Sequence, residues 1–359
     1  MRGKLLLLLC ICSLHLAAQK ADYLIVITTD GLRWQEVFNG MDTALANNKK
    51  YNEGDSSRLY ESFYSDDLYA RRKKLLPFLW SAIAEKGQLY GNRQLNNKVN
   101  NTNPYWFSYP GYSEIFTGHV DTAINSNDYQ PNPNTTVLEF FQQQASFKNK
   151  IAAFGAWDAF DRILNEKRSG IPVISAFDKT APFNPTAQQQ LIDQMLADSY
   201  KPWHTEECLD VFTYAAGMNY LKEKQPNVLY LSFGETDEWA HAGKYRSYLN
   251  AANQVDQWIE QLWNYVQQSP KYKNKTAILI TTDHGRGDFV KSEWTSHGSA
   301  IKGADQIWMA LIGAGIPALG EVKKTQQLYQ QQAAQTMANL LGLSFKATHQ
   351  VAAAVPYKD

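Results

Sequence analysis

The chain has 359 residues, enough for one large α/β domain or two smaller ones. Lysine and arginine together number 35, as do aspartate and glutamate, so the formal net charge is zero. Such a chain has no net field to steer it towards a nucleic-acid polymer or an anionic membrane. We therefore expect no nucleic-acid polymer as a partner, whereas a small polar substrate is compatible with this charge balance.

Residues 1–18 have the layout of a secretory signal peptide. Arg2 and Lys4 precede an apolar run from Leu5 to Ala18, which is too short for a stable membrane span. We expect cleavage near residue 18 and export to a periplasm or to the exterior. Cys208 would then be the one cysteine of the mature chain, which forms no internal disulfide.

Apolar runs alternate with helical periodicity along the rest of the chain. Near-continuous apolar runs predict strands covered on both faces, and they lie at residues 23–29, 150–157, 227–237, 276–285 and 307–316. Helical periodicity occurs at residues 75–87, 137–144, 205–224, 246–268 and 326–342. This alternation predicts an α/β fold over residues 22–359, with a doubly wound, mostly parallel sheet flanked by helices. We expect a single domain with loop excursions, among them the polar stretch 39–72.

Acidic and imidazole side chains gather at the expected strand ends, where open α/β sheets bind their ligands. They follow the first strand in TTDGLRW, the third in SFGETDEWAH and the fourth in TTDHGRG, and one more precedes the last strand in TSHG. The six residues are Asp30, Asp237, His241, Asp283, His284 and His297. An isolated Asp-Gly pair is usually a turn. Six such groups in a chain with only 7 histidines indicate a shared site.

Carboxylates and imidazoles are the ligands that zinc uses in open catalytic sites, and the lack of thiolates argues against a closed structural zinc. Six ligands predict two divalent metal ions, zinc being the first choice, with three ligands each. Two ions about 3.5–4 Å apart can clamp the attacking and leaving oxygens of an in-line displacement at phosphorus. The pattern therefore predicts a metal-dependent enzyme that acts on a small-molecule phosphate ester.

From Asp22 to Pro317, the order of motifs resembles the alkaline phosphatase superfamily and, within it, the type I phosphodiesterase/nucleotide pyrophosphatase branch. That family has a strand-end Asp, a Ser or Thr nucleophile, a D-x-x-x-H pair, a D-H pair and a His before Gly. This chain has DG, a serine, DEWAH, DH and HG in the same order. The resemblance implies phosphodiesterase or phosphatase activity through a phosphoserine intermediate. It also implies two metal sites, formed by Asp237, His241 and His297 and by Asp30, Asp283 and His284.

Two serines compete for the role of nucleophile. Ser113, in GYSE, is similar to the serine in the NSE motif of cofactor-independent phosphoglycerate mutases. The resemblance favours Ser108, because family members place the nucleophile ten residues before a helix-ending glycine, and Gly118 has that spacing from Ser108. Pro110 matches the T-F-P stretch of the favoured branch and suits the first turn of a helix. A helix N-terminus at Ser108 would favour a bound phosphate.

Six residues beside these motifs are candidates for substrate contacts, namely Arg33, Trp34, Asn101, Asn103, Tyr109 and Trp239. The backbone N–H of Tyr109 and a side-chain amide would donate to developing negative charge. The arginine would bind the extra charge of a monoester, as would Lys244 or Arg286, and the aromatic rings would form an apolar wall. Each of these residues fits an ordinary loop or packing role equally well.

Three alternatives stay open. A sulfatase shares the expected fold but needs arginine at the last position of C/S-x-P-x-R, where this chain has Tyr112. A phosphomutase carries additional domains or insertions for which this chain has little room. A catalytically inactive binding protein has no physical reason to keep six converging polar groups. The favoured branch has PNHY and GHxYGP where this chain has PGY and AHAGKY, so its substrates are not transferred.

Overall fold

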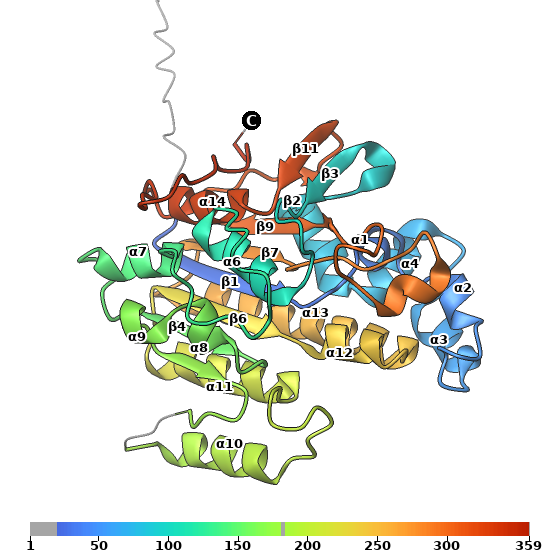
Figure 1. The fold of residues 1–359 in the computed structure, drawn as a ribbon, viewed down its shortest axis with the longest axis horizontal. Coiled ribbons are helices and arrows are strands. Elements are labelled where there is room, and N and C mark those ends of the chain that lie inside the picture. The colour runs from blue at the N-terminus through green and yellow to red at the C-terminus, as the bar shows by residue number, and fades with distance from the viewer. Residues whose placement is uncertain (1–19, 181–183, 359) are drawn as a thin grey trace, which may run out of the picture.

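The computed structural model describes residues 20–180 and 184–358, so the predicted signal peptide lies outside the described residues. Its centre is an eight-stranded sheet with the order β10-β2-β9-β7-β1-β6-β4-β5 (Figure 1). These strands are β1 (Tyr23–Thr29), β2 (Gly87–Tyr90), β4 (Ile151–Gly155), β5 (Val173–Ser175), β6 (Val228–Phe233), β7 (Thr276–Thr281), β9 (Met309–Gly313) and β10 (Gly320–Glu321). A second sheet contains β11 (Gln326–Tyr329), β3 (Asn97–Asn100) and β8 (Gln306–Ile307).

The large sheet is mostly parallel, as predicted. Strands β7, β1, β6, β4 and β5 pair in parallel, whereas β9 is antiparallel to both of its neighbours, β7 and β2. Alternate residues of β1 enter different hydrophobic cores, with Ile25 and Ile27 in one and Leu24 and Val26 in the other. A strand that is buried on both faces has no polar side to show, which explains its continuous apolar run.

Helices cover both faces of the large sheet (Figure 1), which confirms the predicted doubly wound fold class. The face of Ile25 and Ile27 packs against α1 (Trp34–Asn39), α4 (Leu68–Leu75), α11 (Asp210–Glu223) and α13 (Tyr245–Gln268). The face of Leu24 and Val26 packs against α6 (Ser108–Thr117), α7 (Val137–Gln143), α8 (Phe160–Ile163) and α14 (Gln332–Leu340). Further elements are η2 (Arg93–Leu95), α9 (Glu166–Ser169), α10 (Ala187–Asp198), α12 (Glu235–His241) and η3 (Lys291–Thr295). Within the described residues, no helix is both long and apolar enough to cross a membrane.

Three local predictions need correction. The stretch at 39–72, predicted as loops or a small insertion, is helical in large part and contains α2 (Thr43–Ala46), α3 (Ser56–Phe63) and the start of α4. Each of these helices begins after an aspartate whose side chain accepts a backbone N–H. The helix predicted at 75–87 is the end of α4, a π-helix η1 (Leu79–Ile83) and α5 (Ala84–Lys86), and β2 begins at residue 87. The helix predicted at 326–342 begins as β11, because that segment pairs with β3.

A buried carboxylate on α13 holds the start of η1. Asp256 Oδ2 accepts the N–H of Phe78 at 2.7 Å, and its Oδ1 accepts the N–H of Leu79 at 2.9 Å. Burial raises the pKa of Asp256 to about 7, although both N–H groups act in the opposite direction. Because the unfolded-state pKa is about 4, folding takes up a proton between these values, and the stabilisation by this carboxyl falls as pH rises across that window.

We expect Asp256→Ala to lower the free energy of unfolding by about 1–3 kcal/mol, because two buried N–H groups lose their acceptor. Urea unfolding should show a larger loss at about pH 5 than at about pH 8, since the wild-type carboxyl loses its stabilising protonated form as pH rises. Asn264→Ala, at an exposed position of the same helix, should change the free energy by less than about 0.5 kcal/mol. A loss that is the same at both pH values would contradict the assignment.

Candidate active site

The six predicted metal ligands converge at one edge of the large sheet. They are Asp30 after β1, Asp237 and His241 on α12, Asp283 and His284 after β7, and His297 after η3. Because β1, β6 and β7 are parallel neighbours, their carboxyl ends meet at this edge. The predicted convergence of all six residues at one edge of the sheet is therefore present in the structure.

Asp30, Asp283 and His284 form one group, whose ligand atoms lie within 4.8 Å of one another. His284 Nε2 is 3.2 Å from Asp30 Oδ1 and 3.4 Å from Asp283 Oδ2. Both oxygens are buried, and neither has a hydrogen-bond partner among the described residues. His284 Nδ1 faces the carbonyl of Gly285 at 2.9 Å, so the ring proton belongs on Nδ1 and the Nε2 lone pair faces the carboxylates. Three acceptor atoms that face one another are stabilised by a cation between them.

The electrostatics of this group point the same way. Burial raises the pKa of Asp30 well above its ordinary value, and Asp237 raises it further. Burial also raises the pKa of Asp283, and here Asp30 adds to the shift. A nearby divalent cation favours the ionised form of a carboxyl group and would reverse both shifts.

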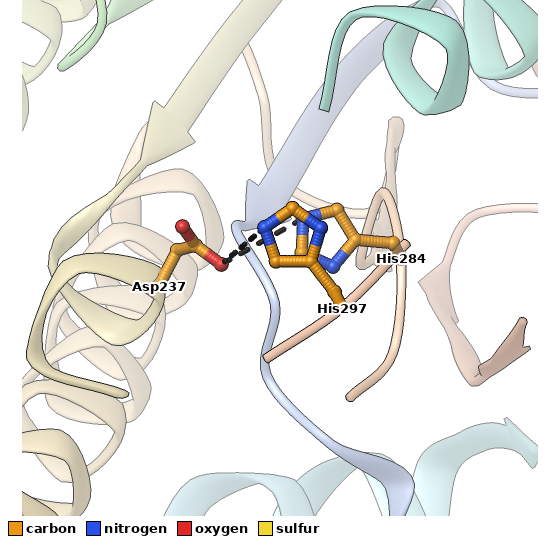
Figure 2. Close-up of side chains that lie close together, drawn as sticks. All are labelled: Asp237, His284 and His297. Atoms are coloured by element: carbon orange, nitrogen blue, oxygen red, sulfur yellow. Dashed lines mark ion pairs between the residues drawn. The ribbon is translucent and has the colours of Figure 1, made fainter. Parts of the chain in front are cut away.

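Asp237, His284 and His297 form a second group within 4.8 Å (Figure 2). Asp237 Oδ1 is 3.7 Å from His284 Nε2 and 3.8 Å from His297 Nε2. His241 lies beside them, with its Nε2 3.0 Å from Asp237 Oδ2 and 3.0 Å from His297 Nε2. The structure thus brings together the set Asp237, His241 and His297 implied by the resemblance, and His284 belongs to both groups.

Ser108 is the first residue of α6, and its Oγ lies 3.5 Å from His284 Nε2. Pro110 follows in the first turn, and Gly118 ends the helix in the left-handed region with φ 65°, as the sequence predicted. The helix axis therefore begins at the candidate metal ligands, where its positive N-terminal end favours an anion.

The next residues of α6 serve the fold. Ser113 is buried, and its Oγ accepts a hydrogen bond from Asn132 Nδ2 at 3.0 Å. Glu114 is also buried, and its carboxylate accepts the backbone N–H groups of Thr102 and Asn103. Burial raises the pKa of Glu114, although these hydrogen bonds oppose the shift. Ser113 therefore has a structural role in α6, and Ser108 stays the candidate nucleophile.

The backbone carbonyl of Asp283 is held from three sides. Asn101 Nδ2 donates to it at 2.6 Å, and Gln330 Nε2 donates to it at 2.6 Å. Gly111 of α6 packs against the same carbonyl so closely that a Cβ there would lie 2.4 Å from the oxygen. The separation between the helix of Ser108 and the loop of Asp283 therefore depends on a glycine at position 111.

The structure contradicts the predicted substrate contact of Arg33, whose guanidinium is fully buried in an ion pair with Glu36 and donates to the Gly287 carbonyl at 3.1 Å. The amides of Asn101 and Asn103 are wrong as substrate donors too. Asn101 holds the Asp283 carbonyl, and Asn103 Nδ2 donates to Glu114 at 2.8 Å. Buried polar groups need partners, and these three have theirs within the protein.

The predicted aromatic contacts are also corrected. Tyr109 is 0% exposed, its hydroxyl donates to the Gln130 carbonyl, and its backbone N–H donates to Asn127 Oδ1 at 3.0 Å. Trp34 Nε1 donates to Gln306 Oε1 at 3.0 Å, and Trp239 Nε1 donates to Glu235 Oε2 at 3.1 Å. Neither tryptophan is among the described residues that line the cavity beside Ser108. Nearness in sequence to a motif did not decide where these side chains point.

Arg286 has a supporting role instead of the predicted substrate contact. Its fully buried guanidinium forms an ion pair with Asp237. It also donates to the carbonyls of Trp294 and Thr295, at 2.8 and 2.7 Å. Burial alone would raise the pKa of Asp237, but Arg286 and the neighbouring histidines hold it well below its ordinary value. Arg286 therefore ties the segment that leads to His297 to the carboxylate of Asp237.

A cavity of about 330 Å³ lies beside Ser108, Asp30 and Asp237. Most of its other lining residues escaped the sequence analysis, namely Asn127, Asp128, Trp157, Asp158, Arg162, Trp203, Glu206, Glu207 and Glu238. Trp157 and Asp158 follow the carboxyl end of β4, so the strand-end rule, applied to this strand as well, would have found them. No comparable signal marks residues 203–207.

Comparison with known proteins identifies the fold. Residues 180–344 match the family model of the Metalloenzyme superfamily, and no curated protein sequence matches the chain. The structure is similar to that of wild-type alkaline phosphatase PafA, with a TM-score of 0.61, 11% identity, and coverage of 94% of this chain and 99% of that chain. The chain has the fold of the alkaline phosphatase superfamily.

Other structures with the alkaline phosphatase-like fold differ in activity. BT1596, a 2-O GAG sulfatase, is similar with a TM-score of 0.55 and 15% identity, covering 91% of this chain and 72% of that chain. The soluble domain of lipooligosaccharide phosphoethanolamine transferase A from Neisseria meningitidis is similar with a TM-score of 0.51 and 12% identity, covering 90% and 89%. The predicted resemblance to the superfamily is confirmed. Because a phosphatase, a sulfatase and a transferase all have similar structures, the type I phosphodiesterase/nucleotide pyrophosphatase branch stays a prediction. The family model that matches residues 180–344 is one of metalloenzymes, and two candidate ligand groups for a metal ion are present among the described residues.

Proposed function

We propose that this protein is a two-metal phosphoester hydrolase, a phosphodiesterase or phosphatase, that acts through a phosphoserine intermediate on Ser108. One observation carries the proposal. Ser108 Oγ, at the N-terminus of α6, lies 3.5 Å from His284 Nε2 and lines the same cavity as Asp30 and Asp237. A nucleophile, an anion-favouring helix end and candidate metal ligands therefore share one space.

The six ligands fit two divalent ions, with zinc as the first choice because the donors are nitrogen and oxygen atoms without thiolates. The unpartnered, buried oxygens of Asp30 and Asp283 support this fit. Such ions, when bound, neutralise charge on the phosphoryl oxygens and ease ionisation of the attacking hydroxyl.

The residues of the chain then divide the reaction between them. Ser108 Oγ forms a bond to phosphorus as the bond to the leaving oxygen breaks. Water later breaks the bond between Oγ and phosphorus, which releases phosphate when the substrate is a monoester and a phosphate monoester when it is a diester. The N-terminus of α6 favours the negative charge of the phosphoryl group. Asn127 lines the cavity, and the N–H of Tyr109 fixes its Oδ1, so Asn127 takes the amide role first expected of Asn101 or Asn103.

The test combines metal analysis with a panel of substrates. After chelation and zinc reloading, we expect about two ions per chain, and a loss of roughly 100-fold or more in aryl phosphodiester or aryl phosphate hydrolysis on chelation. Metal at about 100 times its Kd should add about 2.7 kcal/mol to the free energy of unfolding, visible as a higher Tm. Fewer than one ion per chain after reloading would overturn the proposal and favour an inactive binding protein.

A sulfatase is the second candidate, since BT1596 has a similar fold. Tyr112, at the position where the sulfatase motif has arginine, is buried, and its hydroxyl donates to Asp30 Oδ2 at 3.1 Å. This contact speaks against a formylglycine site. Faster hydrolysis of an aryl sulfate than of either phosphate ester would reverse our preference.

We also propose that residues 1–18 direct export to a periplasm or to the exterior. The charged start and apolar run in the sequence support this proposal. N-terminal sequencing of the protein recovered from the exported fraction should find a chain that begins near residue 19. Recovery of the full chain from the cytoplasm would contradict it.

A further inference from the structure

One wall of the cavity takes no part in phosphoryl transfer. Its acidic residues are Asp128, Asp158, Glu206, Glu207 and Glu238. Arg162 is the one cation among the described residues that line the cavity. Its guanidinium lies 3.9 Å from Asp158 and 3.8 Å from Asp161, so two carboxylates already share its charge. We call these five residues, together with Trp157 and Trp203, the acidic wall.

A short antiparallel pairing holds much of the acidic wall in place. Trp157 pairs with Glu207, and the N–H of Asp158 donates to the Glu206 carbonyl at 2.9 Å. On the other side, the N–H of Cys208 donates to the Ala156 carbonyl at 2.9 Å. The segment after β4 and the segment before α11 therefore form one unit, because their backbones are hydrogen-bonded to each other.

Glu207 is the most buried of the five acidic residues in the acidic wall. It is 7% exposed, and its Oε1 is buried without a hydrogen-bond partner among the described residues. Gly234 packs against it so closely that a Cβ there would lie 1.9 Å from Oε1. Burying a carboxylate without a partner is costly, and a cationic ligand in the cavity would offset that cost.

Two tryptophans in the acidic wall indicate which kind of cation it would bind. Trp203 packs edge-to-face on Trp239 at 5.1 Å between ring centroids, and Trp157 packs in the same way on Phe160 at 6.2 Å. Packing of this kind fixes the rings before a ligand arrives. Ammonium groups bind to aromatic faces through cation–π attraction, and carboxylates add to it. A hydrated inorganic ion would gain from the carboxylates alone.

We propose that the acidic wall binds an ammonium group of the substrate, so that the preferred phosphoester carries a primary or quaternary amine on its organic group. The reaction in this inference rests on the proposed function, whereas the binding does not. A nucleoside polyphosphate or a sulfated sugar is disfavoured, because it would bring more negative charge to a wall of five acidic residues.

The kinetic test compares three p-nitrophenyl phosphodiesters whose second ester group is choline, ethanolamine or a neutral isostere with tert-butyl in place of trimethylammonium. We expect kcat/KM of the zinc-loaded enzyme to favour a cationic ester by roughly tenfold. The faster of the two cationic esters identifies the quaternary or the primary amine. Equal kcat/KM for all three esters would overturn the inference and leave the proposed function standing.

In the double variant Glu206→Gln and Asp158→Asn, the ratio of kcat/KM for the cationic ester to kcat/KM for the neutral ester should fall by about threefold or more. The fall should come mainly from a higher KM for the cationic ester, while kcat/KM for the neutral ester stays the same. Glu85→Gln is the matched control, because Glu85 is exposed on α5, which contacts β2 and β10 at the opposite edge of the sheet. The control should keep the full preference. An equal loss for all three esters in the double variant would show a structural role and contradict the assignment.

A binding measurement separates the two proposals. Zinc-loaded Ser108→Ala is titrated by calorimetry with phosphocholine, phosphoethanolamine and the tert-butyl analogue of phosphocholine. Tighter binding of a cationic ligand supports the acidic wall even where no ester is hydrolysed, a result that would overturn only the proposed function. Equal affinities would overturn the inference whatever the activity.

Discussion

Replacing Ser108 by alanine is expected to lower kcat/KM for an aryl phosphodiester by roughly 10³-fold or more, because the atom that would attack phosphorus is lost. The serine lines the cavity at the end of a helix, and its Oγ is 3.5 Å from His284 Nε2. Alanine suits a helix better than serine, so the variant should fold and bind metal like the wild type. Steady-state kinetics, with metal content measured on the same samples, gives the result.

Ser113→Ala is the matched control, since Ser113 lies on the same helix and is also buried. It loses the hydrogen bond from Asn132, which should cost about 1 kcal/mol of stability. Its kcat/KM should stay within about threefold of the wild type. Full activity in Ser108→Ala, or an inactive but folded Ser113→Ala, would overturn the choice between the two serines.

Gly111→Ala should lower activity almost as much as Ser108→Ala, although Gly111 has no side chain that could bind a metal ion or a substrate. A Cβ at this position would lie 2.4 Å from the Asp283 carbonyl oxygen, which Asn101 and Gln330 hold in place. The helix must therefore move away from the loop, and Ser108 moves with it. Displacement by about 1 Å can cost about 10²-fold in rate. We expect that loss in kcat, together with about 1–3 kcal/mol of stability.

Gly217→Ala separates misplacement of Ser108 from simple overpacking. Gly217 lies in α11, and a Cβ there would lie 2.3 Å from Leu231 Cδ2, the end of a flexible side chain. This variant should lose stability to a similar extent and keep its kcat. A parallel loss of kcat in both variants would mean that general destabilisation, and not the position of Ser108, explains the Gly111 result.

The convergence of the six candidate metal ligands could be predicted because two independent rules agree on these residues. Parallel strands bring their carboxyl ends to one edge, and aspartate and histidine at that edge are zinc-type donors. Asp30 and Asp283 are 253 positions apart by number, yet each directly follows or closely follows a buried apolar strand of the same sheet. The local sequence at each strand end was enough to predict this convergence, because the pairing of the strands brings distant segments together.

The substrate contacts could not be predicted in this way. Arg33 follows a metal-ligand motif closely, but a buried partner, Glu36, decides where its guanidinium lies. The cavity wall depends on the pairing of Trp157 with Glu207, which joins two segments with no shared motif. Side-chain direction within loops is set by tertiary partners, and those partners are not visible in the spacing of residues.

The pairing of β1 with β6 and β7 has a consequence for how the protein acquires its metal. Thr28 of β1 meets Tyr230 of β6 across 202 positions of sequence, so this sheet closes only after most of the chain has been made. Contacts between segments this distant form slowly, because closing a long loop costs entropy. The complete ligand set therefore does not exist in a chain that is still unfolded. If the protein is exported, as we propose, and in that state, it would load the proposed metal ions at its destination, and the metal supply there would govern how much of it stays folded.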